Sequence, residues 1–336
     1  MDSFDIIGQS TLIRRLRNMM DSGRIVHSYL FTGPTGAGKK SISNYFAKML
    51  QCEGRERPCN TCKSCRQMES GNHPDIIRIA SESNNIKVES IRELRKDISI
   101  KPFQSQRKIY IIEEGHKMNH QSQNALLKTL EEPPEHAVII ILAENLASLL
   151  PTIVSRCQII RIPPLSTQEI AQIIESRVEI PHDKALVFAK LAQGIPGRGV
   201  ELALSEEYQQ MRDESLELLI KLAKSSIAQA MGYVDYFLDK RDSVIEILDM
   251  IELWLRDVLV LKQGNLRKII VNIDKISYLE DLANSFTIRD IQCIIDNIEQ
   301  SKRMLMSHAN FHLTIENLLM KIQGSGEHAQ GSRSPV

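Results

Sequence analysis

The sequence predicts an α/β domain with a parallel sheet, followed by an all-α region. Short β-rich apolar runs alternate with helical patterns up to about residue 163, as they do in βαβ units. A glycine-rich turn of the form G-x-x-x-x-G-K lies between the first of these strands and its helix, which is where a phosphate-binding loop would lie. From Ser166 onward, apolar residues recur at helical spacing and strand patterns fade.

Composition is typical of a soluble globular protein. The 336 residues are enough for two or three domains. Lys+Arg and Asp+Glu are equal at 42 each, so net charge gives no general attraction to nucleic acid. The longest apolar run, 137–143, is too short to cross a bilayer, and the N-terminus has no signal-peptide pattern. We therefore expect a cytoplasmic protein without a membrane partner.

A strand is predicted at 28–31, and a helix at 41–50 follows the glycine-rich turn. Backbone N–H groups of the turn, together with Lys39, would surround phosphates. The next position should carry a hydroxyl for Mg²⁺, but Lys40 has an ammonium, which cannot ligate a cation. Ser41 lies about 100° further around the helix and is a poor substitute. We expect weak ATP or ADP binding and a defective Mg²⁺ site; a chance glycine loop is the alternative. The candidate phosphate-binding residues are Gly33, Gly36, Gly38, Lys39, Lys40 and Ser41.

A cysteine cluster follows that helix, within residues 52–65. Tetrahedral Zn²⁺ takes four thiolates, and two-residue spacings let one turn present them together. A C-x₂-C-x₂-C run is also found in iron–sulfur ligation, but the fourth cysteine of that pattern is missing downstream. We favour structural zinc over an iron–sulfur cluster or free surface thiols. Cys157 and Cys293 have apolar neighbours and are predicted to be core residues. The candidate metal ligands are Cys52, Cys59, Cys62 and Cys65.

The next strands carry a pair of acidic candidates. A strand at 76–79 and a helix at 86–98 precede the strand 108–112, an apolar run typical of a parallel strand buried on both faces. That strand ends in Glu113 and Glu114. Acidic residues there lie beside the phosphate-binding loop in an open α/β sheet, where they hold a Mg²⁺-bound water or polarise the attacking one. Two solvated carboxylates are the alternative.

Arg156 is the last candidate in the α/β domain. A helix at 123–132 ends at two prolines, and strands are predicted at 137–142 and 158–162. Arg156 directly precedes the second of these strands, at a boundary between loop and strand. Since an unpartnered arginine is costly to bury, we expect it at the surface or at an interface.

The remaining chain is predicted to be helical. A small helical unit is expected at 164–205, and long amphipathic helices are expected at 206–323. The Gly/Ser/Gln-rich stretch 324–336 is predicted to be disordered. The α/β domain would then occupy 1–163.

Taken together, these motifs resemble the delta-prime family of bacterial DNA polymerase III clamp-loader subunits, within the AAA+ superfamily. The resemblance covers roughly residues 4–323. It rests on Ile7-Gly8-Gln9, His27 to Phe31, the four cysteines, His73-Pro74-Asp75, Asn124 to Pro134, Ser155-Arg156-Cys157, Gly194 to Arg198 and Trp254 to Asp257.

The resemblance implies a subunit of a pentameric ring that loads a sliding clamp onto primed DNA during DNA replication. It implies an AAA+ domain, a helical lid and a helical collar that holds the ring together. The implied partners are gamma/tau-type motor subunits, a delta-type subunit, the sliding clamp and, through the complex, primed DNA. Arg156 would be an arginine finger that reaches a neighbour's nucleotide; an ordinary solvated arginine or a local salt bridge is the alternative. Arg198 would be a lid arginine that senses a phosphate.

Departures from the family pattern surround the chain's own nucleotide site. Lys40 replaces the hydroxyl, Glu113 and Glu114 replace the usual Asp-Glu pair, and Ala143 followed by Glu144 stands where a polar sensor is expected. Together they predict that the chain's own ATP hydrolysis is absent or weak. The resemblance then implies that the chain serves the polymerase holoenzyme, a nucleotidyltransferase complex, as scaffold and finger donor. The alternatives are an ATP-hydrolysing motor subunit and a stand-alone P-loop nucleotide enzyme.

Overall fold

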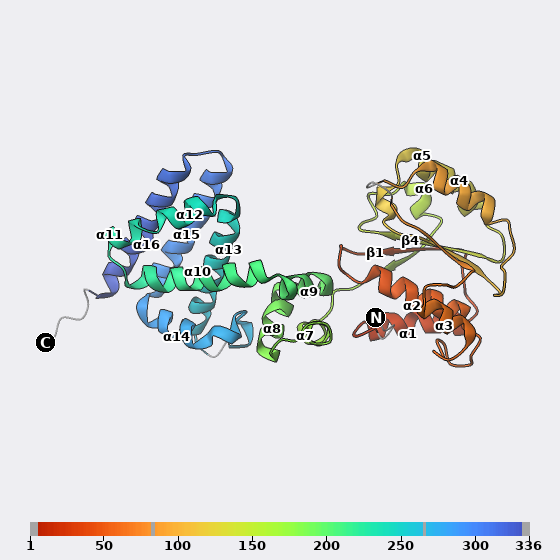
Figure 1. Ribbon diagram of the computed structural model, residues 1–336, viewed down its shortest axis with the longest axis horizontal. Coiled ribbons are helices and arrows are strands. Elements are labelled where there is room, and N and C mark those ends of the chain that lie inside the picture. The colour runs from red at the N-terminus through yellow and green to blue at the C-terminus, as the bar shows by residue number, and fades with distance from the viewer. Residues whose placement is uncertain (1–5, 82–84, 265–266, 331–336) are drawn as a thin grey trace. The chain divides into compact units, whose positions relative to one another are not determined.

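The computed structural model describes most of the chain and divides it into two compact units (Figure 1). The described residues are 6–81, 85–264 and 267–330. The α/β unit comprises Met1–Ile173 and Ala192–Arg198, and the helical unit comprises Ile174–Leu191 and Gly199–Val336. The segment 164–205, expected as a separate lid, is therefore shared between the two units. The domain boundaries at 163 and 205 stay predictions.

In its described residues the α/β unit contains a five-stranded parallel sheet in the order β2–β3–β4–β1–β5. The strands are β1 Ser28–Thr32, β2 Ile76–Ile79, β3 Lys108–Ile112, β4 Ala137–Ala143 and β5 Gln158–Arg161. The register pairs Thr32 with Ala143 and Ile112 with Ile141. The carboxyl ends of β1, β3 and β4 therefore lie side by side, and the residues that follow them gather at one edge of the sheet. The predicted α/β fold class is confirmed.

Helices cover both faces of this sheet. Alternate β1 side chains point to opposite faces, so Tyr29 and Phe31 pack in one core cluster and Leu30 packs in another. Figure 1 shows α1, α2 and α3 on the first face, and α4, α5 and α6 on the second. These helices are α1 Ser10–Asp21, α2 Lys39–Gln51, α3 Lys63–Glu69, α4 Val88–Asp97, α5 His120–Glu131 and α6 Pro151–Val154, and the short η1 Gly115–Lys117 follows β3. Helix α7 Thr167–Glu175 crosses the division between the two units.

The predicted elements differ from the observed ones mainly at their ends. Helix α5 begins three residues before the predicted start at 123, because the Asn119 side chain caps it by accepting a hydrogen bond from the Ser122 N–H at 2.8 Å. Its end before the two prolines is as predicted.

The helical unit packs around one apolar cluster that includes Ile251, Trp254 and Leu318. Helix α9 Pro196–Leu204 begins in the α/β unit and ends in the helical unit. The other elements are α8 His182–Leu191, α10 Glu206–Lys224, α11 Ile227–Met231, α12 Val234–Asp239, η2 Arg241–Ser243, α13 Val244–Lys262, η3 Arg267–Ile269, η4 Ile273–Lys275, α14 Ile276–Ser285, α15 Ile288–Met306 and α16 Phe311–Gln330.

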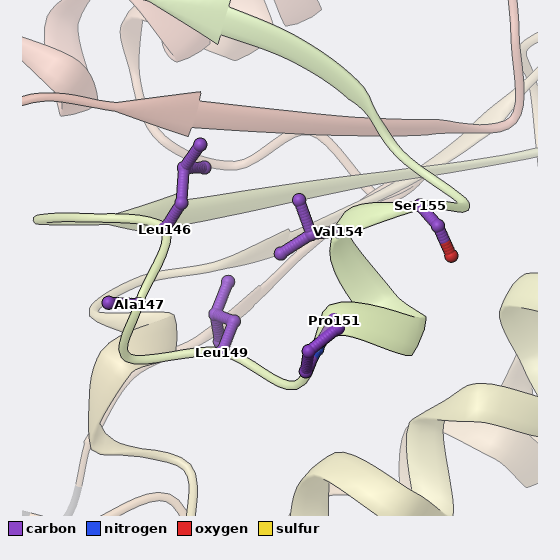
Figure 2. Close-up of a pocket in the computed structure, with 6 residues that line it drawn as sticks. All are labelled: Leu146, Ala147, Leu149, Pro151, Val154 and Ser155. Carbon is purple, nitrogen blue, oxygen red and sulfur yellow. The ribbon is translucent and has the colours of Figure 1, made fainter.

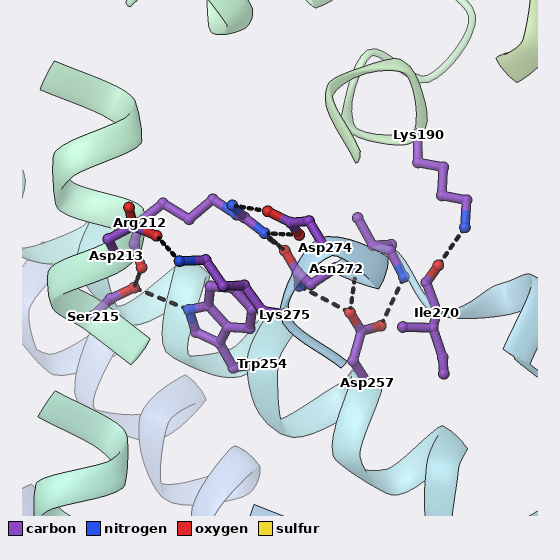
Figure 3. A network of polar contacts seen from close by, with 11 residues as sticks. Lys190, Arg212, Asp213, Ser215, Trp254, Asp257, Ile270, Asn272, Asp274 and Lys275 are labelled. Atoms are coloured by element: carbon purple, nitrogen blue, oxygen red, sulfur yellow. Dashed lines mark hydrogen bonds and ion pairs between the residues drawn. The ribbon is translucent and has the colours of Figure 1, made fainter. Parts of the chain in front are cut away.

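A buried polar network lies inside the helical unit (Figure 3). The Arg212 guanidinium donates to both carboxylate oxygens of Asp274, at 2.9 and 2.6 Å, and to the Asn272 side-chain oxygen. The same guanidinium stacks 4.8 Å from the Trp254 ring centroid. The Asp257 carboxylate accepts the Asn272 N–H at 2.8 Å. The network therefore joins α10, α13 and η4, together with Asn272 directly before η4, through satisfied hydrogen bonds.

Two predictions for the helical region are wrong. Helix α16 continues to Gln330, so 324–330 is helical where disorder was predicted; 331–336 lies outside the described residues. Each glycine lowers the stability of a helix by only about 1 kcal/mol relative to alanine. Because nucleation is the costly step, a helix that has already formed can continue through such a segment. Cys293 is exposed rather than in the core, because it lies two residues after buried Ile291 and so faces away from it.

The prediction for Cys157 is closer to the structure. Cys157 is half-buried against the second core cluster, and burial raises the pKa of its thiol to about 12. No helix in the described part of the chain is both long and apolar enough to cross a membrane.

Candidate functional site

The glycine-rich turn joins β1 to α2 at the carboxyl edge of the sheet. Gly36 and Gly38 have φ angles of 80° and 89°, a left-handed conformation that favours glycine. The Lys39 ammonium donates to the carbonyl oxygens of Gly33, at 2.6 Å, and Pro34, at 2.9 Å, and burial lowers the pKa of Lys39. The predicted turn residues thus meet at the N-terminus of α2, the arrangement of an anion-binding loop.

The two acidic residues that follow β3 are both engaged by cations of the chain. The Lys40 ammonium lies 3.0 Å from one Glu113 oxygen, and Arg78 lies 3.5 Å from the other. Glu114 pairs with Lys117 at 2.7 Å, and that hydrogen bond is the main reason that the pKa of Glu114 is lowered. Lys40 therefore contacts the carboxylate that was expected to support Mg²⁺.

The end of β4 places a carboxylate on the glycine-rich turn. Ala143 is the last residue of the strand and offers no polar side chain. Glu144 follows, and its carboxylate accepts a hydrogen bond from the Thr35 hydroxyl at 2.5 Å, the main reason that the pKa of Glu144 is lowered. The same carboxylate oxygen lies 3.4 Å from His116 Nε2. A negative charge thus stands beside a turn that would bind phosphate.

The start of α9 packs directly on the same turn. The Gly197 N–H donates to the Gly36 carbonyl at 2.9 Å. A Cβ on Gly197 would lie 2.6 Å from Gly36 Cα, so only glycine allows this approach. The Arg198 backbone N lies 3.4 Å from the point that a Cβ on Gly36 would occupy. The structure therefore brings the backbone of Arg198 to the turn, while its side chain is exposed.

Arg156 lies two residues before β5, at the boundary between loop and strand that the sequence predicted, and it follows the short helix α6, which was not predicted. One guanidinium nitrogen is 2.8 Å from a Glu131 carboxylate oxygen, and another donates to the Thr152 carbonyl at 3.0 Å. The side chain of Arg156 is 36% exposed and that of Glu131 is 49% exposed. This is a surface ion pair, which contributes only about 0–1 kcal/mol and separates easily.

The residues just before Arg156 in the sequence line an apolar pocket (Figure 2). Its residues come from the loop after β4 and from α6. They are Leu146, Ala147, Leu149, Pro151, Val154 and Ser155.

The four predicted metal ligands lie together. Their Sγ atoms all lie within 4.8 Å of one another, whereas tetrahedral Zn–S bonds of about 2.3 Å would place sulfurs roughly 3.8 Å apart. A Cβ on Gly54 would lie 2.7 Å from Cys59 Cβ, so the chain folds this tightly around the thiols only with glycine there. The donor set therefore fits a four-thiolate metal site after a small contraction.

The thiols differ in how easily each loses its proton. Hydrogen bonds from Thr61, and from the Cys62 N–H, lower the pKa of Cys59 to about 5. Burial raises the pKa of Cys52 and of Cys65. A cation would favour the ionised form of these two buried thiols, as binding to zinc does.

Glu131 and Arg78 were not among the residues predicted from sequence, although both contact predicted ones. One signal for Glu131 was present. It is the last residue of α5, and a carboxylate is unfavourable at the negative end of a helix unless a cation is near. For Arg78 there was no local signal, because its contact with Glu113 depends on the pairing of β2 with β3.

Comparisons with known proteins give consistent matches. The chain matches the family described as DNA polymerase III, delta subunit, over residues 8–166, and the family described as DNA polymerase III, delta subunit, C terminal, over residues 206–324. It is similar to DNA polymerase III subunit delta' of Bacillus subtilis (strain 168), with 31% identity over 325 residues that cover 94% of this chain and 96% of that protein.

Other matches are partial or structural. DNA polymerase III subunit tau of Escherichia coli (strain K12) is 33% identical over 72% of this chain, which spans about a third (34%) of that longer protein. A gamma subunit-related protein of Thermotoga maritima has a TM-score of 0.39 at 18% identity, covering 93% of this chain and 99% of its own. The Bacillus subtilis clamp loader delta protein has a TM-score of 0.36 at 13% identity, with the same coverage.

Proposed function

Because the chain belongs to the DNA polymerase III delta subunit family, we propose that it is the delta-prime subunit of a bacterial clamp loader. It acts as a scaffold and arginine-finger donor while other subunits use ATP to load a sliding clamp onto primed DNA. The observation that carries this proposal is the match to the Bacillus subtilis delta' subunit, which extends over nearly the whole of both chains.

The chain's own nucleotide site is proposed to be inactive. Mg²⁺ needs oxygen ligands, and position 40 supplies an ammonium that pairs with Glu113 instead. The Glu144 carboxylate next to Thr35 would repel the phosphates of a nucleotide. A motor subunit would need a hydroxyl at position 40 and a polar side chain at 143. Both features are absent from this sequence.

Arg156 is proposed to act on the site of the neighbouring subunit. Its backbone is fixed, because the Arg156 N–H bonds to the Ile153 carbonyl at 3.1 Å and β5 begins two residues later. Glu131 and Thr152 occupy part of the guanidinium. The planar fork has five donors, so further N–H groups remain for a phosphate.

The cysteine cluster is proposed to bind one structural zinc ion through Cys52, Cys59, Cys62 and Cys65. Zinc bound by four thiolates has no open position and supplies folding energy rather than catalysis.

The experiment is a reconstituted clamp loader in which only the site next to this chain can hydrolyse ATP. Arg156→Ala should reduce DNA-stimulated hydrolysis there by about 10³–10⁵-fold, the usual effect of a finger supplied in trans. Total ATPase should fall only partly when the other sites are active. Arg15→Ala, an exposed arginine on α1, is the matched control. If the isolated site turns over at the normal rate, Arg156 is not the finger.

A further inference from the structure

The loop between α4 and β3 presents an unusual surface. Phe103 is 85% exposed, more than any other large apolar residue that the structure describes. Ile100, in the same loop, is 60% exposed. Such exposure is common on mobile loops. Here, however, the backbone of residues 103–105 is firmly held.

A buried carboxylate holds this backbone. Asp75, only 1% exposed, accepts the N–H groups of Phe103 at 2.5 Å, Gln104 at 3.0 Å and Ser105 at 2.9 Å. Bonds to an ionised acceptor are about twice as strong as neutral ones. Burial raises the pKa of Asp75, but these donors outweigh it, and the net change is downward. The carboxylate therefore stays ionised and the loop stays in place.

Helix α3 also contacts the loop, directly through Gln67 and indirectly through His73. Gln67 accepts a hydrogen bond from the Gln104 side chain. His73 Nε2 lies 3.4 Å from the hydroxyls of both Ser64 and Ser105, while its Nδ1 accepts the Asp75 N–H at 3.2 Å. His73 therefore carries its proton on Nε2 and links α3 to the loop.

Two of the cysteines lie at the start of α3, Cys62 as its N-cap and Cys65 in its first turn. Cys62 caps the helix, and its sulfur accepts the Cys65 N–H at 3.4 Å. Ser64 lies between them. A helix of seven residues is not stable alone. Its second half is anchored to the core by buried Met68, so only its first turn depends on the cysteine cluster.

We propose that the cysteine cluster, when it binds metal, positions the loop 99–106 and thereby the exposed Phe103 ring. Metal binding fixes the first turn of α3, and that turn reaches the loop through Ser64 and His73. Gln67 lies in the half of the helix that Met68 anchors, so its bond to Gln104 does not depend on the metal. The glycine-rich turn is not part of this linkage. Helix α2 runs from that turn to Cys52, but its own buried side chains, Tyr45, Phe46 and Met49 among them, hold it in the core.

This inference rests on the metal site proposed above and not on the clamp-loading role. The test begins with elemental analysis of the purified full-length chain. Hydrogen exchange is then measured by mass spectrometry before and after removal of the metal with a chelator. We expect exchange at 103–105 to become about tenfold faster or more, the effect of losing one or two ordinary hydrogen bonds. Exchange at 42–50 in α2 should not change.

A decoupling variant separates positioning of the loop from general stability. Ser64→Ala should keep the metal and still accelerate exchange at 103–105, because it removes the contact between the first turn of α3 and His73. Arg66→Ala, an exposed residue of the same helix, should have no effect. Equal acceleration at 42–50 on metal removal would overturn the proposal, and so would unchanged exchange at 103–105 in either the metal-free chain or the decoupled variant. Purified protein without metal would instead refute the metal site itself.

Discussion

Lys40 shows how one residue can change what a site does without changing its fold. The turn, the helix N-terminus and Lys39 are all arranged for a phosphate, yet Lys40 pairs with the carboxylate that would support Mg²⁺. The Lys40 ammonium partly takes the place of Mg²⁺ beside Glu113, so the Glu113 carboxylate keeps a positively charged partner. The fold therefore needs no nucleotide at this position to satisfy Glu113.

We predict that the purified chain has no significant ATPase activity and that Lys40→Thr alone does not create one. The new hydroxyl would restore one Mg²⁺ ligand, but Ala143 would still offer no polar contact and Glu144 would still face the turn. The variant should remain folded, since the Lys40 side chain is 65% exposed and its ion pair contributes little. Phosphate release by wild type and variant, with and without Mg²⁺, is the measurement. Robust Mg²⁺-dependent turnover by the wild type would favour the motor-subunit alternative.

Among the elements, α10 and α13 depend on polar groups as well as on apolar packing. The Trp254 indole N–H donates to the Ser215 hydroxyl at 3.0 Å, and Arg212 covers the indole ring. Figure 3 shows this group together with Asp274 and Asn272. Lys190 on α8 donates to the Ile270 carbonyl in the same region. The helices are thus held in one relative position by bonds that require specific partners.

Arg212→Ala should destabilise the helical unit by about 3–5 kcal/mol. The substitution leaves Asp274 without its cation and Asn272 without its donor, and breaking a buried pair costs about that much. Urea unfolding can be followed by fluorescence, because Trp254 is the one tryptophan of the chain. Lys221→Ala, at an exposed site of α10, should change the free energy of unfolding by less than about 0.5 kcal/mol. A similar small change for Arg212→Ala would show that the network is not a stabilising one.

At the scale of the whole molecule, the chain combines an α/β unit and a helical unit whose roles are proposed to differ. The candidate finger and the cysteine cluster both belong to the α/β unit. Among the described residues of the helical unit, buried Arg212 and Lys302 pair with carboxylates. Buried Asp257 and Asp290 accept hydrogen bonds from neutral donors. The family match extends over both units, so the proposed function belongs to the full chain.

We predict that the tagged full-length chain, purified from its own cells, brings gamma/tau-type and delta-type subunits with it. The physical reason is that a finger acts only across an interface, so the chain must sit next to an ATP-binding subunit. Mass spectrometry of the purified complex identifies the partners, and an unrelated tagged protein serves as the control. A chain that purifies alone under gentle conditions, and that turns over ATP by itself, would support the stand-alone enzyme instead.

Much of the fold could be predicted from local sequence. The buried strands β3 and β4 are continuous apolar runs, and the prolines after α5 mark its end. The cysteine spacing indicated the cluster that the structure assembles. These predictions succeeded because each depends on neighbouring residues. The predictions of disorder at 324–330 and of a buried Cys293 were wrong. Composition alone does not indicate whether a helix continues through a segment or in which direction a side chain points.

By itself, the sequence determined the sheet class, the glycine-rich turn, the cysteine cluster and the loss of a hydroxyl at position 40. Only the tertiary structure decided which charges meet. Glu113 lies between Lys40 and Arg78, Arg156 rests on Glu131, and Asp75 holds a loop nearly thirty residues away. Local patterns depend on backbone geometry over a few residues. Contacts between distant charges depend instead on strand order and helix packing, which bring together positions that no spacing in the sequence relates.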